Sequence, residues 1–335
     1  MSTSIVTLFQ AAIVFGTVIL FGAMGEILTE KSGNLNLGVP GIMYLGGISG
    51  LIGAFFYESA AALPSPGLGI LIAMVCAVVG AMLGGLIYSF LTITLRANQN
   101  VTGLTLTIFG SGIANFFGGS LNKLAGGVGQ ISVAVTSSGF RANLQSLVGR
   151  NAVTDLFLSY GFLAYVGIIL AVLMFWFFRR TPAGLNLRSV GENPATADAA
   201  GINVTRYKYL ATCIGAGISG LGGLYYVMDY TKGTWANDGT IESLGWLAVA
   251  LVIFATWKSL NAIWGSYLFG ILFWIYLYIP ELTNHAIELT RRSQELFKML
   301  PYIATILVLI FVSLRNKKEN QPPNSLGLSY FREER

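Results

Sequence analysis

The chain has 335 residues, of which 54% are hydrophobic and only 10% are charged, and its mean hydropathy is +0.67. Soluble domains contain roughly 25% charged residues, so this composition excludes an ordinary soluble protein and indicates a membrane protein. The net charge of +5 is too small to suggest nucleic-acid binding. One histidine and two cysteines provide neither a metal-ligand cluster nor a disulfide framework.

Long charge-free windows predict the helices of the chain. A crossing needs roughly 20 apolar residues, and helices are favoured over barrel strands because the windows lack alternating apolar residues. We therefore expect an all-α polytopic membrane domain over residues 1–314, with about nine helices and a range of eight to ten. The expected spans, of which 243–257 and 299–314 are short, are 4–24, 36–57, 68–94, 101–118, 158–178, 207–228, 243–257, 260–279 and 299–314.

The distribution of Lys and Arg predicts the orientation. If nine spans alternate, 13 of the 20 basic residues fall on the face that carries residues 179–205 and the C-terminus. Basic loops stay in the cytoplasm, so we expect the N-terminus outside and the C-terminus in the cytoplasm. Residues 315–335 are polar and contain two adjacent prolines, which predicts a disordered cytoplasmic tail.

A polar insert at 179–205 separates two apolar stretches, and its centre at 188–203 reads RSVGENPATADAAGIN. Pro182 and Pro194 interrupt any continuous helix, while residues 195–200 suit one short helix that begins after Asn193. Such a helix outside the membrane suits a groove on a soluble partner; the alternative is a plain solvated loop. The candidate contact residues are Arg188, Gly191, Glu192, Asn193, Pro194, Asp198, Ala199, Ala200 and Gly201.

Nucleotide and catalytic motifs are missing from the sequence. The pattern Gly-x-x-x-x-Gly-Lys-Ser/Thr does not occur, and the Gly-x-Gly-x-x-Gly match at 215–220 lies in an apolar window without a preceding strand. No paired acids or Ser/His arrangement of a hydrolase is visible. We therefore expect a chain that is not an enzyme and binds no cofactor. Any Mg-ATP that drives transport would bind a separate ATPase.

Polar residues within or beside the spans are candidates for a substrate pathway. Asn and Gln are costly in hydrocarbon, so they should face the bundle interior or a water-filled path; hydrogen bonding between helices is the equally plausible alternative. Asp229 and Glu26 are expected at helix ends, where a carboxylate can reach the membrane interface. For Asp229, the alternative to lining the pathway is a role as an interfacial anchor. The pathway candidates are Asn98, Gln99, Asn100, Thr102, Thr105, Asn115 and Asp229.

Glycine is unusually abundant, with 41 residues. Many are spaced as small-x-x-x-small, as in Gly46/Gly50, Gly80/Gly84 and Gly215/Ser219. Small residues let helix backbones approach closely in lipid. This spacing predicts tight packing inside the bundle; dimerisation through one such face is the alternative.

Four stretches carry a resemblance to a known family. They are GEILTEKSGNLNLGVPGIM at 25–43, RANQNVTGL at 96–104, the 188–203 insert with the GINVTRYKYL that overlaps its end, and WANDGTIESLGWLAVALVIFATW at 235–257. Together they resemble permease subunits of bacterial ABC importers for nucleosides and simple sugars, and the nucleoside branch fits best. The family usually has an acidic residue where this chain has Pro40.

This resemblance implies the ABC importer permease fold in the bacterial cytoplasmic membrane and import of nucleosides by alternating access. It also implies three partners: an ABC ATPase that contacts 188–203, a second permease subunit that is a paralogue, and an extracellular or periplasmic substrate-binding protein. A simple-sugar permease is the first alternative. A secondary transporter is less favoured, because such proteins more often place coupling carboxylates at the membrane midplane.

Overall fold

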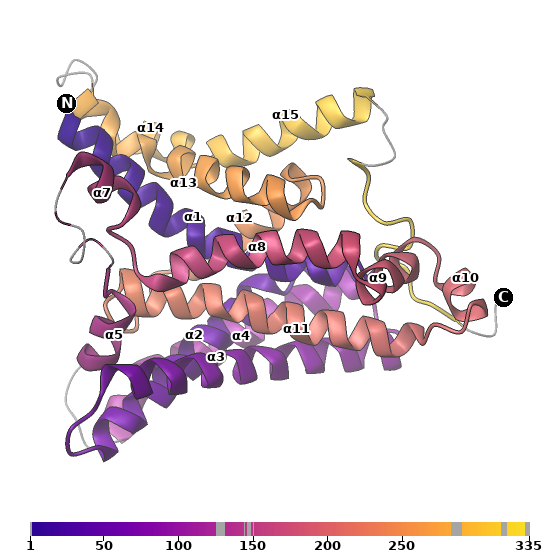
Figure 1. Ribbon diagram of the computed structural model, residues 1–335, viewed down its shortest axis with the longest axis horizontal. Coiled ribbons are helices and arrows are strands. Elements are labelled where there is room, and N and C mark those ends of the chain that lie inside the picture. The colour runs from indigo at the N-terminus through magenta and orange to yellow at the C-terminus, as the bar shows by residue number, and fades with distance from the viewer. Residues whose placement is uncertain are drawn as a thin grey trace.

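The computed structural model describes residues 2–124, 131–143, 145, 149, 151–282, 290–315 and 320–331. Throughout these residues the regular elements are helices (Figure 1). Eight helical segments are long and apolar enough to cross a membrane, and α12 is a shorter apolar helix. The expected count of about nine is therefore confirmed as eight long helices and one short one within the described residues.

The helices that correspond to the expected spans, including the shorter α12, lie close to the expected positions. They are α1 (Ser2–Glu30), α2 (Val39–Ala60), α3 (Pro66–Ser89, extended by the π-helical turn η1, Phe90–Thr94), α4 (Gln99–Leu124), α8 (Phe162–Arg180), α11 (Val204–Tyr225, extended by η2, Tyr226–Tyr230), α12 (Thr240–Phe254), α13 (Ser259–Leu282) and α15 (Leu300–Arg315). The short helices are α5 (Ala134–Phe140), α7 (Ala152–Phe157), α9 (Pro182–Glu192), α10 (Pro194–Ala199) and α14 (Arg291–Phe297).

The long helices run side by side and form one bundle (Figure 1). α1 packs on α11, α12 and α13, while α2 packs on α3, α4 and α11. α2 and α11 are the two spans whose surfaces are most covered by the rest of the chain. α9 and α10 lie at one end of the bundle, here called the loop end, whereas α5, α7 and α14 lie at the opposite end.

Glycines bring the central helices into backbone contact. A Cβ on Gly46 of α2 would lie 2.3 Å from the Cα of Gly220 in α11, and one on Gly215 would lie 2.4 Å from the carbonyl oxygen of Gly25 in α1. Only residues without a side chain permit such crossings. The predicted role of the small residues in packing inside the bundle is thus confirmed at these positions.

The connection between α1 and α2 folds back into the bundle. Val39 begins α2 beside Gly22 of α1, on which a Cβ would lie 3.6 Å from Val39 Cγ1. α1 continues to Glu30, roughly 12 Å further at 1.5 Å per residue. Residues 31–38 therefore return about that distance into the bundle. Irregular backbone is tolerated at such depth only where protein surrounds it.

Side chains from other helices satisfy the backbone of this returning segment. Leu35 N donates to Gln99 Oε1 at 2.7 Å, and the hydroxyl of Tyr88 in α3 donates to the carbonyl oxygen of Leu35. Asn36 N donates to Glu26 Oε1 at 3.0 Å. Gln99, one of the candidate pathway residues, thus pairs with main chain that would otherwise be unsatisfied.

Candidate functional site

The polar insert folds into two short helices, and each begins with a proline. Pro182 starts α9 and Pro194 starts α10. Proline suits the first helical position, because it lacks only an N–H that would have no partner there. The preceding side chains cap both helices: Thr181 Oγ1 accepts from Gly184 N and Asn193 Oδ1 accepts from Thr196 N, each at 3.0 Å. The expected short helix after Asn193 is confirmed, and α9 is an addition to the expectation.

The two helices present a buried face and an exposed face. Val190, Ala197 and Val204 form a small apolar cluster beneath them. Apart from Leu185 in α9, the exposed face is made largely of small or polar side chains, and it contains Arg188, Glu192, Asn193, Thr196, Ala199, Ala200 and Gly201. Gly201 has a φ of +83°, a conformation that glycine adopts without strain. Seven exposed positions without a large apolar side chain make a surface that a soluble partner can approach closely.

Gly191 differs from the other candidate contact residues because it is buried. A Cβ there would lie 2.2 Å from the carbonyl oxygen of Lys31. Its own carbonyl oxygen accepts from the amide of Ser325 at 3.0 Å and from the hydroxyl of Ser325 at 2.6 Å. Gly191 therefore holds the insert against the segment after α1 and against the C-terminal tail.

Residues 320–331 of the tail pack on the loop end, which differs from the expected disorder of 315–335. Gly327 N donates to the carbonyl oxygen of Gly33 at 3.2 Å, and the hydroxyl of Tyr330 donates to Asp198 Oδ2 at 2.9 Å. The ring of Phe331 lies 4.4 Å from the guanidinium carbon of Arg96. Although the tail is mostly polar, its apolar side chains stabilise the packing, since Leu326 and Tyr330 pack against core clusters.

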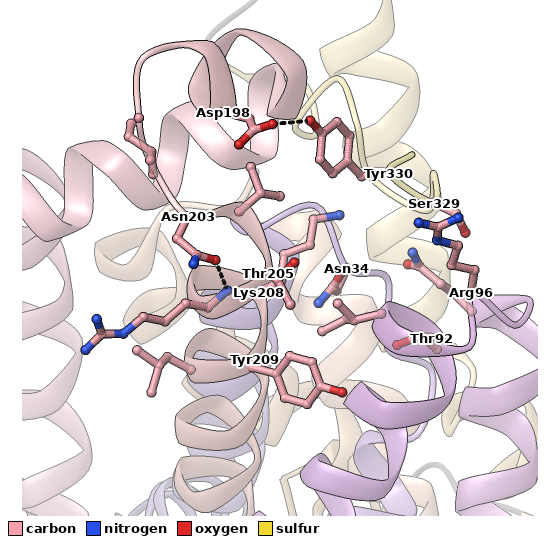
Figure 2. Close-up of a pocket in the computed structure, with 17 residues that line it drawn as sticks. Asn34, Thr92, Arg96, Asp198, Asn203, Thr205, Lys208, Tyr209, Ser329 and Tyr330 are labelled. Carbon is pink, nitrogen blue, oxygen red and sulfur yellow. Dashed lines mark hydrogen bonds between the residues drawn. The ribbon is translucent and has the colours of Figure 1, made fainter. Parts of the chain in front are cut away.

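A cavity of about 690 Å³ lies between the insert, the start of α11 and the tail (Figure 2). Arg96, Gln99 and Asn34 line one side of it, while residues 203–206 and 208–210 line the other. Ser329 and Tyr330 of the tail close it. Three of the sequence candidates, Gln99, Asp198 and Gly201, therefore belong to one polar cavity at the loop end.

The other candidates at the start of α4 and just before it are not gathered on one face. Asn98, Asn100 and Thr105 are exposed, whereas Thr102 is buried. The hydroxyls of Thr102 and Thr105 each donate at 2.8 Å to the carbonyl oxygen four residues earlier in their own helix. Such local bonds satisfy the hydroxyl of a threonine inside the membrane, so these two residues need no substrate pathway to explain them.

Two remaining candidates lie toward the opposite end. Asn115 Oδ1 accepts a hydrogen bond from Trp235 Nε1 at 3.2 Å. This contact between distant segments fits the alternative that these polar residues bond to other parts of the bundle and do not line a pathway. Asp229 lies in η2 and lines a second cavity of about 440 Å³ together with Gln10, Phe15, Tyr160 and Tyr230, among others. The Phe15 and Tyr230 rings meet edge to face, with centroids 4.7 Å apart. This cavity combines aromatic rings with an amide and a carboxylate.

Three ionisable side chains are buried although the sequence does not predict their burial. Glu26, expected at an interface, is 1% exposed, and Glu30 is 3% exposed and accepts a hydrogen bond from Trp257 Nε1. Lys208 in α11 is 3% exposed. The Glu pair has a usable signal, because residues four apart share a helix face. Lys208 had no such signal, since a lysine at the end of a predicted span ordinarily indicates an anchor in the interface.

Pro40, where the resembling family has an acid, has a structural role. It is in the first turn of α2. A Cβ on Gly245 of α12 would lie 2.5 Å from its Cα. The proline thus fixes the start of the helix that follows the returning segment, and it packs directly against α12.

Comparisons with known proteins agree with the geometry. Residues 8–309 match the family described as branched-chain amino acid transport system / permease component. A putative glucose ABC transporter permease protein of Haloferax volcanii is 31% identical, over 97% of this chain and 98% of that protein.

Two further relatives are named for nucleosides. The guanosine ABC transporter permease protein NupQ of Bacillus subtilis is 27% identical, and the nucleoside ABC transporter permease protein NupC of Lactococcus lactis subsp. cremoris is 29% identical. Each alignment covers 89% of both proteins. No solved structure matches the chain.

Proposed function

Since this chain belongs to the family of branched-chain amino acid transport system permease components, we infer that it imports nucleosides by alternating access, driven by ATP hydrolysed on a separate subunit. The coarser assignment is a multi-pass permease subunit of an ABC importer. In the finer assignment, α10 contacts the ATPase, the loop end faces the cytoplasm, and the opposite end contacts a substrate-binding protein. A second permease, a paralogue of this chain, completes the pathway.

The observation that carries the coupling role is the exposed face of α10. Ala199 and Ala200 lie at its end with exposed side chains, while Ala197 on the other face is buried. α9 and α10 contact each other, and α9 contacts both α8 and α11. A push on α10 therefore reaches two spans through packed helices, which is what a rigid coupling element requires.

Ala200→Glu tests this role. The side chain is exposed, so folding and membrane insertion should be unchanged, whereas ATPase association and ATP-driven uptake should both be lost. Ala62→Glu is the matched control, because Ala62 is exposed in the connection between α2 and α3. It should leave ATPase association intact. Normal ATPase association and uptake with Ala200→Glu would contradict the coupling role.

Two observations favour nucleosides as the substrate. The relatives named for guanosine and for nucleosides each align over 89% of this chain. In addition, the second cavity offers the rings of Phe15, Tyr160 and Tyr230 beside Gln10 and Asp229. Stacking of a base on an aromatic ring is worth ~1–3 kcal/mol, and the amide and carboxylate suit the polar edge of a base or a ribose hydroxyl.

Glucose is the second candidate, because the relative at 31% identity is named for it. Uptake by the complete transporter in proteoliposomes separates the two. We expect ATP-dependent accumulation of labelled guanosine or uridine that excess unlabelled glucose does not reduce. Glucose accumulation without nucleoside accumulation would instead assign the chain to sugar import. The permease chain alone should not hydrolyse ATP, because its sequence has no phosphate-binding loop.

A further inference from the structure

Lys208 is a buried cation without a partner of opposite charge. Its side chain is 3% exposed, and within the described residues it forms neither an ion pair nor a hydrogen bond. Removing an ammonium group from water is unfavourable unless an anion or several acceptors replace the water. A lysine held in this way indicates that something negatively charged belongs beside it.

The space beside Lys208 is the cavity of about 690 Å³ at the loop end (Figure 2). Arg96 and Arg206 also line it, so three basic side chains face one acidic one, Asp198. The carboxylate of Asp198 already accepts a hydrogen bond from Tyr330 at 2.9 Å. The cavity is therefore electropositive and suits an anion.

The backbone around the cavity adds to this preference. α11 begins here, and Asn203, Val204 and Thr205 of its N-terminus line the wall. The N-terminus of a helix carries a partial positive charge, and here Asn203 Oδ1 accepts from Arg206 N at 2.9 Å. Arg96 has a φ of +57°, a conformation that is uncommon for a residue with a side chain and that recurs at ligand sites.

Asn34 narrows the chemistry of the ligand. It is 1% exposed and lines the cavity, and its Nδ2 donates to Thr212 Oγ1 at 3.0 Å. Its Oδ1 is buried and accepts no hydrogen bond from the described residues. A ligand that satisfies both Lys208 and Asn34 must carry a negative charge and a hydrogen-bond donor.

We propose that this cavity binds a phosphate ester with a free hydroxyl group. Lys208 and Arg96 hold the phosphate, and Asn34 Oδ1 accepts a hydrogen bond from the hydroxyl. The ligand has two sources with the same chemistry: the headgroup of an anionic phospholipid such as phosphatidylglycerol, or a soluble phosphate ester such as a nucleoside monophosphate. This site adjoins the insert through Asp198 and Gly201 but does not include Ala199 or Ala200, and it does not depend on which substrate is transported.

Binding measurements on the full chain test the proposal without the ATPase. In one arm, the chain in phosphatidylcholine nanodiscs is titrated with inorganic phosphate, glycerol 1-phosphate and uridine 5′-monophosphate. In the other arm, the chain is taken from mixed phosphatidylglycerol and phosphatidylcholine vesicles, and retained lipid is measured by native mass spectrometry. We expect binding in one arm, with the hydroxylated esters or phosphatidylglycerol held more tightly than inorganic phosphate or phosphatidylcholine.

Lys208→Met should weaken this binding about tenfold or more, the usual effect of losing a charge-assisted hydrogen bond. Arg180→Met is the matched control, because Arg180 is exposed at the end of α8 and does not line the cavity. Its binding should equal that of the unmodified chain. Arg96→Gln, at an exposed position, tests the site without altering the buried lysine and should also weaken binding.

Lys208→Met should unfold at the same or a higher temperature than the unmodified chain, since it removes an unpaired buried charge. Lost binding with retained stability would support the site. The proposal is overturned if the unmodified chain binds in neither arm, or if Lys208→Met and Arg96→Gln both bind as tightly as the unmodified chain.

Discussion

Gly46 of α2 and Gly112 of α4 are both glycines inside helices, but their surroundings are opposite. A Cβ on Gly46 would lie 2.3 Å from the backbone of Gly220, whereas one on Gly112 would meet nothing within 4 Å. We expect Gly46→Ala to destabilise the chain by about 1–3 kcal/mol, because α2 and α11 must move apart. Gly112→Ala should be neutral or stabilising by up to ~1 kcal/mol through helix propensity. Thermal unfolding in detergent measures both effects. Equal effects of the two substitutions would contradict the close contact between α2 and α11 at Gly46 and Gly220.

Lys31 gives a prediction about pH. Burial lowers its pKa from the ordinary value of 10.5, and Arg188 and Lys258 lower it further, while Glu192 and Glu30 raise it. Because the pKa is lower in the folded chain, the unfolded chain binds the proton more tightly. The resulting destabilisation is fully present below the folded pKa and is lost as pH rises toward 10.5.

Lys31→Met should therefore unfold at a higher temperature than the unmodified chain at pH 7, and the difference should shrink as pH approaches 10.5. Lys123→Met is the control, since Lys123 is exposed at the end of α4. Its difference from the unmodified chain should stay near zero at both pH values. If the gain in unfolding temperature of Lys31→Met instead grew with pH, the lowered pKa of Lys31 would be contradicted.

At the scale of elements, the tail and the insert depend on each other. The hydroxyl of Ser325 donates to the carbonyl oxygen of buried Gly191 at 2.6 Å. Ser325→Ala removes this bond and should cost about 1 kcal/mol. Amide hydrogen exchange should then become faster across 188–203. Ser138→Ala is the control, because the hydroxyl of the exposed Ser138 in α5 donates to the carbonyl oxygen of Val135 in the same helix. Unchanged exchange in Ser325→Ala would mean that the tail does not restrain the insert.

The sequence predicts elements well where the signal is local and poorly where partners are distant. Apolar windows located the spans, and Asn193 followed by proline located α10. α9 was missed because Pro182 was interpreted as an interruption, although proline also begins helices. The tail was missed because its contacts join residues more than 130 positions apart, as in the pair Ser325 and Gly191.

The polar interior was missed for a related reason. The sequence predicts an ordinary loop at residues 31–35 and the start of a span at 36–38. Residues 31–38 instead form an irregular segment inside the bundle, where Gln99, Tyr88 and Glu26 satisfy its backbone. Only the assembled fold brings these donors and acceptors together. The same holds for the candidate site: the outward face of α10 could be predicted from composition, whereas the cavity around Lys208 needed the tail, α3, α4 and α11 to be in place.

At the scale of the whole molecule, basic residues are unevenly distributed between the two ends. Among the described residues, Arg96, Arg180, Arg206 and Lys258 are exposed beside connections at the loop end, and fewer exposed basic residues flank α5 and α7. Arg150, Lys317, Lys318, Arg332 and Arg335, which also entered the expected orientation, lie outside the described residues. Basic connections are retained in the cytoplasm during insertion. We therefore expect the loop end to face the cytoplasm.

Thr196→Cys and Ser138→Cys test this orientation, because both side chains are exposed and they lie at opposite ends of the bundle. A membrane-impermeant maleimide added to intact cells should label Ser138→Cys and leave Thr196→Cys unlabelled; permeabilised cells should label both. The native Cys76 and Cys213 lie within the spans Pro66–Thr94 and Val204–Tyr230, so a charged reagent should not reach them, and the unmodified chain is the control. Labelling of Thr196→Cys but not Ser138→Cys in intact cells would place α10 outside the cell, where no ATPase could reach it, and would overturn the orientation and the coupling role together.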